Sequence, residues 1–140
     1  MKILLPVDGS EHSTRVARHV IQMVHGCADY EILLLNVQEP IDAPELRGHM
    51  PAREIDAMQE SRGGDAMTSA RALLDAAGVV CVPEVVLGPV AASIARIASE
   101  RQCEAIVMGS HGAGALTSAL VGSVTAQVIR HAPCPVTVVK

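Results

Sequence analysis

Short apolar runs alternate along the chain with segments that have helical spacing. The apolar runs lie at residues 2–7, 31–37, 79–87, 104–108 and 136–139, and most of them lack polar alternation. Continuous runs of this kind are typical of strands that are buried on both faces. Strands separated by helices favour a parallel sheet covered by helices on both faces. We therefore expect an α/β fold, Rossmann-like, with a single doubly wound five-stranded parallel sheet and residues 1–140 forming one domain.

Polar and small residues between the runs predict where helices begin and where pairing is interrupted. Ser10 follows the first strand and is placed to cap the next helix. The longest helical pattern covers residues 51–77, and Gly63 and Gly64 inside it predict a kink, a break or a mobile section. Pro83 interrupts the third apolar run and favours an edge strand, or pairing that starts after the proline.

A glycine-bearing stretch follows the fourth apolar run and leads into the last helical pattern, at residues 122–131. It consists of Gly109, two residues, Gly112, nine residues, and then Gly122 and Ser123. A strand, a glycine loop and a helix start together present unpaired backbone N–H groups to an anion. The spacing matches neither GxGxxG nor the P-loop pattern. It therefore indicates either a phosphate site or a turn that only needs the conformational freedom of glycine.

Charge and aromatic content exclude two classes of partner. The chain carries 11 Lys and Arg against 15 Asp and Glu, a net charge of -4, and Tyr30 is its only Phe, Trp or Tyr residue. Without a basic field or an aromatic platform, we expect no nucleic-acid partner. No apolar run approaches the roughly 20 residues of a membrane span, and the N-terminal run is too short for a signal peptide. We therefore expect no membrane partner and a cytoplasmic protein.

The four cysteines, at positions 27, 81, 103 and 134, form no CxxC pair. No cluster of other metal-ligating residues lies beside any of them in the sequence. In a reducing compartment we expect small side chains that are buried or half-buried. The alternative is a redox-sensing role for one of them.

The spacing from Gly109 to Ser123 resembles the nucleotide-binding sequence of the universal stress protein family, in its ATP-binding branch. Further blocks of the same resemblance occur in the same order along the whole chain. These blocks are Pro6-Val7-Asp8-Gly9-Ser10-Glu11 with Ser13, Leu34-Leu35-Asn36-Val37, Val107-Met108-Gly109-Ser110-His111-Gly112, and Gly122-Ser123-Val124 with His131-Ala132-Pro133-Cys134-Pro135-Val136. The resemblance implies a parallel sheet with the strand order 3-2-1-4-5.

The resemblance also implies which residues contact a nucleotide. Asp8 would lie beside the adenosine ribose or a bound metal, Val37 would contact adenine, and Met108 would lie near the nucleoside. The remaining contacts, to ribose and phosphates, would come from Gly109, Gly112, Gly122 and Ser123.

Each of these roles has a plainer alternative. Asp8 could be a turn residue that caps the first helix, and Val37 and Met108 could be ordinary core residues. His111 is the only titratable side chain in the glycine stretch. We expect it to position the ligand or donate a hydrogen bond, with a catalytic role as the alternative.

The span from Ala113 to Val121 carries no charge, although family members that bind ATP often have a basic residue there. The γ-phosphate then lacks a point-charge partner, so the preference could shift from ATP toward ADP or AMP. A Mg²⁺ ion could partly compensate for the missing charge. We expect an adenine nucleotide as the ligand, with or without Mg²⁺.

The leading hypothesis is a nucleotide-binding regulator or sensor of the stress response, and not a fast enzyme, because no nucleophile-base pair is apparent. Slow ATP hydrolysis or nucleotidyl transfer, with Asp8 holding Mg²⁺, is one alternative. An interaction module whose glycine loop is structural is the other. The resemblance further implies a homodimer through the last strand, Pro135 to Val139, which is short, apolar and at a sheet edge.

Overall fold

The computed structural model describes residues 1–40, 50–111 and 121–140. The strands are β1 (Lys2–Pro6), β2 (Glu31–Gln38), β3 (Cys81–Leu87), β4 (Ala105–Gly109) and β5 (Val136–Val139). The helices are α1 (Glu11–Val24), α3 (Ala52–Ala76), α4 (Val90–Glu100) and α5 (Ser123–His131). Strands and helices therefore alternate as the apolar runs predict. Within these three ranges, no helix is both long and apolar enough to cross a membrane.

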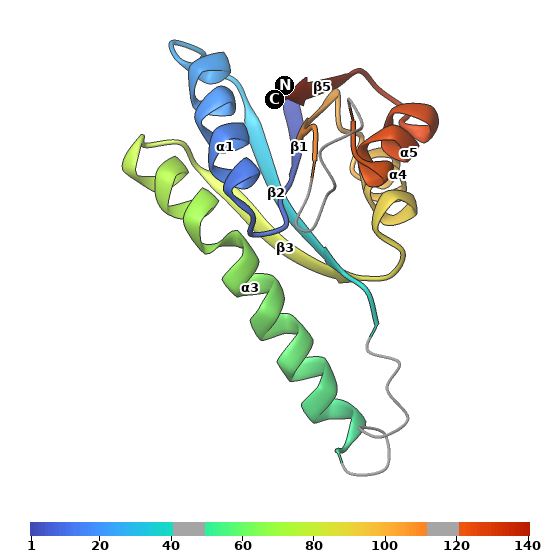
Figure 1. Cartoon of the computed structure of the whole chain (residues 1–140). Helices are drawn as coiled ribbons and strands as arrows, with labels where there is room; N and C mark the ends of the chain where they lie inside the picture. Colours follow the sequence, from blue (N-terminus) through green and yellow to red (C-terminus); the bar gives the residue numbers. More distant parts are fainter. Residues whose placement is uncertain (41–49, 112–120) are drawn as a thin grey trace.

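The strands form one sheet in the order β3-β2-β1-β4-β5, and all neighbouring pairs are parallel (Figure 1). In the central strand, Leu4 lies opposite Leu33 of β2 on one side and Ile106 of β4 on the other. This α/β Rossmann-like arrangement confirms the predicted fold and strand order. Pro83 lies in the edge strand β3, as predicted, but pairing with β2 already begins at Cys81. An edge strand tolerates the proline because its outer side needs no ladder hydrogen bond.

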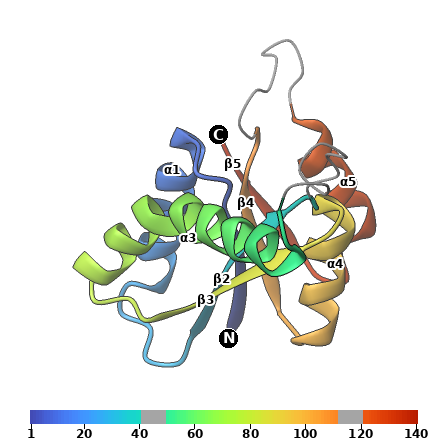
Figure 2. The same ribbon diagram turned by 90° about the horizontal axis from the view of Figure 1, so that it is seen from below.

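Both faces of the sheet are apolar because successive side chains of a strand point to opposite faces. In β1, Ile3 and Leu5 pack in a core with α1 and α3, whereas Leu4 packs in a second core with α4 and α5. All three side chains are fully buried. Figures 1 and 2 show the two pairs of helices on opposite sides of the sheet. The continuous apolar runs of the sequence therefore follow from helices on both faces.

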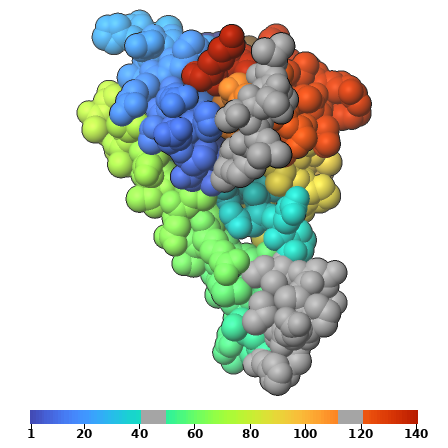
Figure 3. Space-filling view, viewed as in Figure 1, coloured from blue at the N-terminus to red at the C-terminus, as the bar shows by residue number. Residues whose placement is uncertain are grey.

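Helix α3 continues through Gly63 and Gly64 without interruption, so of the predicted kink, break or mobile section the break is wrong. Gly63 is buried, and a Cβ built on it would lie 2.7 Å from Cγ2 and 3.1 Å from Cβ of Val85 in β3. This glycine lets the helix backbone approach the sheet closely. At Gly64 an added Cβ would meet no described atom within 4 Å. Figure 3 shows the N-terminal part of α3 projecting beyond the body of the molecule.

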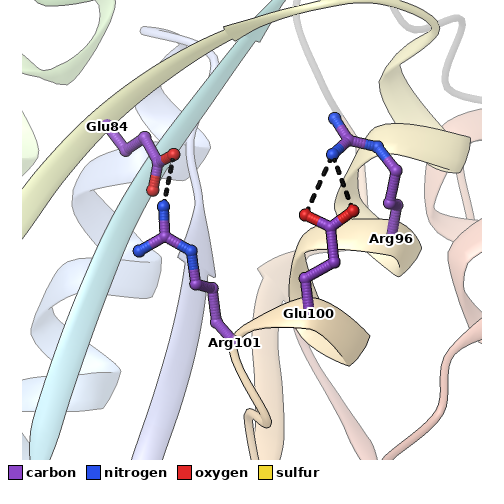
Figure 4. A network of polar contacts seen from close by, with 4 residues as sticks. All are labelled: Glu84, Arg96, Glu100 and Arg101. Atoms are coloured by element: carbon purple, nitrogen blue, oxygen red, sulfur yellow. Dashed lines mark hydrogen bonds and ion pairs between the residues drawn. The ribbon is translucent and has the colours of Figure 1, made fainter.

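Two arginines near the C-terminal end of α4 form ion pairs (Figure 4). Arg101, directly after the helix, donates to Glu84 of β3 at 2.8 Å and so connects this end of α4 to the edge strand. Arg96 pairs within the helix with Glu100, both of whose carboxylate oxygens lie 3.1 Å from one guanidinium nitrogen. At the surface such pairs contribute about 0–1 kcal/mol each, so they orient α4 more than they stabilise the fold.

The cysteines are free thiols, and one of them is more exposed than expected. Cys103 is buried and Cys81 and Cys134 are half-buried, as the sequence predicts. Cys27 is exposed, because it lies in the turn that follows α1, so the expectation is wrong there. Burial raises the pKa of the thiols of Cys81, Cys103 and Cys134 above the usual cysteine value. These three thiols are therefore kept in the protonated, unreactive form.

Candidate functional site

β1 and β4 lie side by side at the centre of the sheet, and the chain leaves them in opposite directions. β1 continues through α1 to β2 on one side, whereas β4 continues through α5 to β5 on the other. The two helices also cover opposite faces of the sheet. Such a reversal of strand order creates a crevice at the carboxyl ends of the two strands, where ligands of open α/β sheets bind. Asp8 follows β1 and Gly109 ends β4, so both flank this point.

Asp8 is held in a hydrogen-bonded turn between β1 and α1. Its Oδ1 accepts a hydrogen bond from the backbone N–H of Ser10 at 3.0 Å and another from the hydroxyl of Ser13 at 3.2 Å. The Ser13 hydroxyl in turn accepts the backbone N–H groups of Asp8 and Gly9, both at 3.2 Å. The turn role weighed for Asp8 is therefore present, while its side chain stays exposed toward the crevice end of the sheet.

Ser10 occupies the N-cap position of α1, but its side chain makes no capping hydrogen bond. The predicted side-chain cap is therefore wrong. The hydroxyl of Ser13, which is buried in the first turn of the helix, accepts the N–H groups of the turn instead. This role of Ser13 was not predicted, although a serine three residues after an expected N-cap can indicate a side chain that accepts the N–H groups of the turn.

The end of β2 is connected to the end of β1 by a buried amide. Nδ2 of Asn36 donates to the carbonyl oxygen of Val7 at 2.7 Å, and its Oδ1 accepts from Nε2 of Gln38 at 2.6 Å. Asn36 is 2% exposed and its contact with Val7 is buried, whereas the contact with Gln38 is partly buried. The amide thereby fixes the strand end that precedes Asp8. Asn36 is a polar residue inside an apolar run, and this pattern could have identified it as a functional or structural polar residue, but no role was predicted for it.

Val37 and Met108 pack in the core on the α4 and α5 face of the sheet. Met108 is buried at 5% exposure, and Val37 is half-buried against the same cluster. Core packing, the plainer alternative for both residues, is therefore present. Val37 belongs to β2 and Met108 to β4, so they lie on either side of β1.

The end of β4 passes close to the first turn of α1. A Cβ built on Gly109 would lie 3.2 Å from Cβ of His12, so a larger residue would be crowded there. The next residue, Ser110, is buried; its N–H donates to the carbonyl oxygen of Val139 at 2.9 Å. The Ser110 hydroxyl lies 3.1 Å from Nδ1 of His111. Gly112, the next predicted residue, lies outside the described residues.

A hydroxyl next to an imidazole is also the arrangement of a nucleophile and its base. Ser110 is only 5% exposed, however, and the two residues are neighbours in the chain at the end of a strand. The contact orients the His111 ring, and the role of His111 toward a ligand stays a prediction.

The first turn of α5 is attached to the end of β4 by two hydrogen bonds. The N–H of Gly122 donates to the carbonyl oxygen of Ser110 at 2.6 Å, and the hydroxyl of Thr125 donates to the carbonyl oxygen of Gly109 at 2.9 Å. A Cβ on Gly122 would lie 3.3 Å from the Ser110 oxygen, so glycine permits this close approach. Thr125 was not predicted from the sequence.

The start of α5 has the properties of an anion site. The first N–H groups of any helix lack partners inside the helix, and the N-cap residue Gly122 has no side chain that could cap them. Ser123, the first helical residue, is exposed with its hydroxyl at this end. The helix start can therefore donate backbone hydrogen bonds to a negatively charged group beside Gly109.

The structure thus brings part of the predicted set together. Asp8, Gly109, His111, Gly122 and Ser123 lie at the ends of β1 and β4 or at the start of α5. Val37 lies one strand away, at the end of β2. Within residues 1–40, 50–111 and 121–140, no group of three His, Cys, Asp or Glu side chains could hold a metal ion.

A surface hollow lies at the same edge of the sheet, next to β2 and β3. Its lining is mostly apolar and includes Pro40, Met50, Ile55, Gln59 and Leu87. Gln59 is buried, and its Nε2 donates to the carbonyl oxygen of Glu39 at 2.9 Å, which connects α3 to the end of β2. None of the residues that line the hollow belongs to the ends of β1 and β4 or to the start of α5.

Sequence comparisons identify relatives over nearly the whole chain. A protein from Methanocaldococcus jannaschii named universal stress protein MJ0531 is 31% identical over 139 residues, which cover 99% of this chain and 81% of that protein. A protein from Thermus aquaticus, named universal stress protein in the QAH/OAS sulfhydrylase 3' region, is 32% identical over 141 residues, covering 99% of this chain and 97% of the relative. Both relatives therefore align with the chain from end to end.

Solved structures with the same fold include three with bound nucleotides. The hypothetical protein MJ0577 matches with a TM-score of 0.83 at 30% identity, covering 99% of this chain and 94% of its own. A universal stress protein from Archaeoglobus fulgidus in complex with dAMP has a TM-score of 0.70 at 21% identity and covers 100% and 98%. An Arabidopsis thaliana family member with AMP bound has a TM-score of 0.70 at 21% identity and covers 100% and 91%. A universal stress protein in complex with cAMP has a TM-score of 0.74 at 20% identity and covers 100% and 97%.

The family assignment rests on sequence as well as on fold. A family model described as the universal stress protein family matches residues 1–140. The two relatives, each above 30% identity, carry the same family name. The chain belongs to the universal stress protein family.

Proposed function

We propose that this protein binds an adenine nucleotide in the crevice between β1 and β4 and acts as a nucleotide-dependent regulator or sensor in a stress response. The observation that carries the proposal is the attachment of α5 to β4 through Gly122 and Thr125. It holds an uncapped helix start beside the end of a strand, where backbone N–H groups can bind phosphate. The dAMP, AMP and cAMP complexes of proteins with this fold support an adenine nucleotide as the ligand.

We assign the nucleotide contacts as the family resemblance implies. Asp8, exposed and held by its turn, contacts the ribose, and the exposed part of Val37 contacts adenine. Met108 supports the nucleoside from the core below the crevice. The glycines of the loop, including Gly112, with Ser123 contact ribose and phosphates, and His111 positions the ligand. The bound nucleotide would then extend from the end of β2, where the adenine lies, across β1 to the end of β4, where the phosphates lie at the start of α5.

Phosphate binding in this chain depends on backbone groups. The span from Ala113 to Val121 contains no charged residue. We infer that ATP binds. A lysine in this span would favour ATP over ADP and AMP, so without one the affinities for the three nucleotides should lie closer together. Mg²⁺ would supply part of the missing positive charge for the triphosphate.

Calorimetric titration with ATP, ADP and AMP tests the proposal, with Gly122→Val as the site variant and Gly64→Ala as its control. Valine at 122 adds a Cβ 3.3 Å from the Ser110 oxygen and pushes the helix start away from β4, so binding should weaken at least tenfold. Gly64 lies on the open side of α3, and its variant should bind like the wild type. Flat titrations for all three nucleotides at millimolar concentration would contradict the proposal.

We propose that nucleotide binding is not coupled to fast catalysis, since Ser110 is buried and His111 is engaged with it. Incubation with Mg-ATP should leave the nucleotide intact over many minutes. Product formation that is lost in Gly122→Val would instead favour a slow ATPase or nucleotidyl-transfer activity at this site.

We further propose that residues 1–140 act as one cytoplasmic domain that dimerises through the edge strand from Pro135 to Val139. β5 pairs only with β4 among the described strands, so its other edge offers backbone groups to a second copy. A net charge of -4 argues against nucleic acid or an anionic membrane as partner. Light scattering at micromolar concentration should give a dimer mass. Val138→Pro, at a residue whose backbone N–H points away from β4, should convert it to a monomer mass.

A further inference from the structure

His12 carries a second imidazole, besides that of His111, at the carboxyl end of the sheet, and no role was predicted for it from the sequence. It is the second residue of α1 and so follows β1, whereas His111 follows β4. Its Cβ lies 3.2 Å from the position that a Cβ on Gly109 would occupy. Because β1 and β4 flank the point at which the strand order reverses, His12 occupies the α1 side of the crevice.

The ring of His12 has an unsatisfied polar atom. Its Nδ1 is buried and makes no hydrogen bond to any described residue, and the same holds for the hydroxyl of Ser10, two residues earlier. Buried polar atoms nearly always have hydrogen-bond partners, so two buried atoms without one in the same turn require an explanation. Both lie at the turn that leads from β1 into α1, where a ligand in the crevice could supply an acceptor or donor.

His12 and His111 approach each other across the ends of the two strands. Their ring centroids are 6.2 Å apart, and the ring planes are inclined by 42°. Two protonated imidazoles at this separation repel each other, whereas an anion between or beside them is attracted by both. A protonated histidine also carries two N–H donors, which suit the oxygens of a phosphate. The pair is therefore arranged to favour a negatively charged ligand.

Arg15 and Lys140 are the basic residues on the described elements that surround this end of α1. The charged and titratable groups on the surrounding elements are Asp8 and Glu11 in the same turn, Arg15 one turn later, His111 after β4, Asp65 beside Ala66 on α3, and Lys140 after β5. Arg15 lies 3.6 Å from the Glu11 carboxylate at the surface, which compensates its charge. The glycine span that could carry a basic residue is uncharged in the sequence.

We propose that His12 supplies the positive charge of the nucleotide site: in its protonated form it binds a phosphate oxygen together with His111, so that affinity rises as pH falls. This inference rests on the proposed nucleotide function and adds a pH response to it. The protonated ring attracts phosphate and the neutral ring does not. Affinity is therefore higher at a pH at which the ring is protonated, and it falls as the pH rises and the ring loses its proton.

The test compares ATP affinity at about pH 6 and about pH 8 in the wild type and three variants. His12→Gln removes the charge, His12→Lys makes it permanent, and His25→Gln changes an exposed histidine at the other end of α1 as a control. A terminal phosphate also titrates near pH 6, but this contribution is common to all proteins and cancels when their pH ratios are compared.

When the pH falls from about 8 to about 6, the ATP affinity of the wild type and of His25→Gln should rise by a factor about five times larger than that of His12→Gln. This difference is expected for one partly exposed charged hydrogen bond. His12→Lys should show the smaller pH ratio of His12→Gln, but should bind more tightly than the wild type at the higher pH. Equal pH ratios in wild type and His12→Gln, or no gain at high pH in His12→Lys, would overturn the inference. If His12→Gln does not fold by circular dichroism, His12→Lys decides alone. Absence of binding in the wild type at both pH values would instead contradict the proposed function.

Discussion

Replacing Gly63 by alanine tests whether the close contact between α3 and β3 sets the position of the long helix. Gly63 is buried inside α3, directly above Val85. In an isolated helix this replacement stabilises by roughly 1 kcal/mol, because alanine is the better helix former. Helix propensity alone therefore predicts a more stable protein.

The structure predicts the opposite sign. The new Cβ would lie 2.7 Å from Cγ2 and 3.1 Å from Cβ of Val85, well inside ordinary contact distance. Rotation of the valine moves its methyl groups but not its Cβ, so α3 itself must shift from the sheet. Overpacking of this kind costs about 1–3 kcal/mol. With the propensity gain subtracted, we expect a net loss of up to about 2 kcal/mol, or several degrees in Tm.

Urea denaturation and thermal unfolding followed by circular dichroism measure this difference. Gly64→Ala is a matched control in the same helix, and because its Cβ meets open space it should stabilise by about 1 kcal/mol. Gly63→Ala combined with Val85→Ala relieves the clash. The double variant should therefore lose less stability than the sum of the losses of the two single variants, by about 1 kcal/mol or more. If Gly63→Ala stabilises the protein as much as Gly64→Ala does, the contact with Val85 does not set the position of α3.

Two further predictions concern a buried amide and the thiols. Asn36→Leu should cost about 2 kcal/mol in urea denaturation, because the Val7 carbonyl and the Gln38 amide lose their shared partner; a change below about 0.5 kcal/mol would argue against the bridge. Ellman's reagent should modify Cys27 first, since it is exposed, whereas burial raises the pKa of the thiols at 81, 103 and 134, so these should react slowly and faster as pH rises. A fast phase that survives in Cys27→Ser would contradict this order.

The sequence predicted the strands and the alternation of the fold because each strand is buried on both faces. Leu4 and Leu5 point to different cores, and such strands appear as continuous apolar runs. The order of the strands is not encoded in periodicity, and it came from the resemblance to a family. The edge position of β3 was available from Pro83, because proline is tolerated only where a ladder bond is not needed.

The errors arose where a particular contact, either distant or within the same turn, outweighs the preference of the residue type. Gly63 was interpreted as a weak point, but its role depends on Val85 in another element. Ser10 has the right residue type for a helix cap, yet the Ser13 hydroxyl takes the N–H groups of the turn. His12 is the unmatched position between Glu11 and Ser13 in the first block of the resemblance, and only the approach of β4 to α1 indicates a role for it.

Amide chemical shifts measured by NMR during a titration with ATP can locate nucleotide binding between β1 and β4 residue by residue. The largest shifts are expected at Gly109, Gly122 and Ser123, at the end of β4 and the start of α5, with smaller ones in the turn at Asp8. Shifts confined to the hollow beside Gln59, or no shifts at millimolar ATP, would contradict binding between these strands.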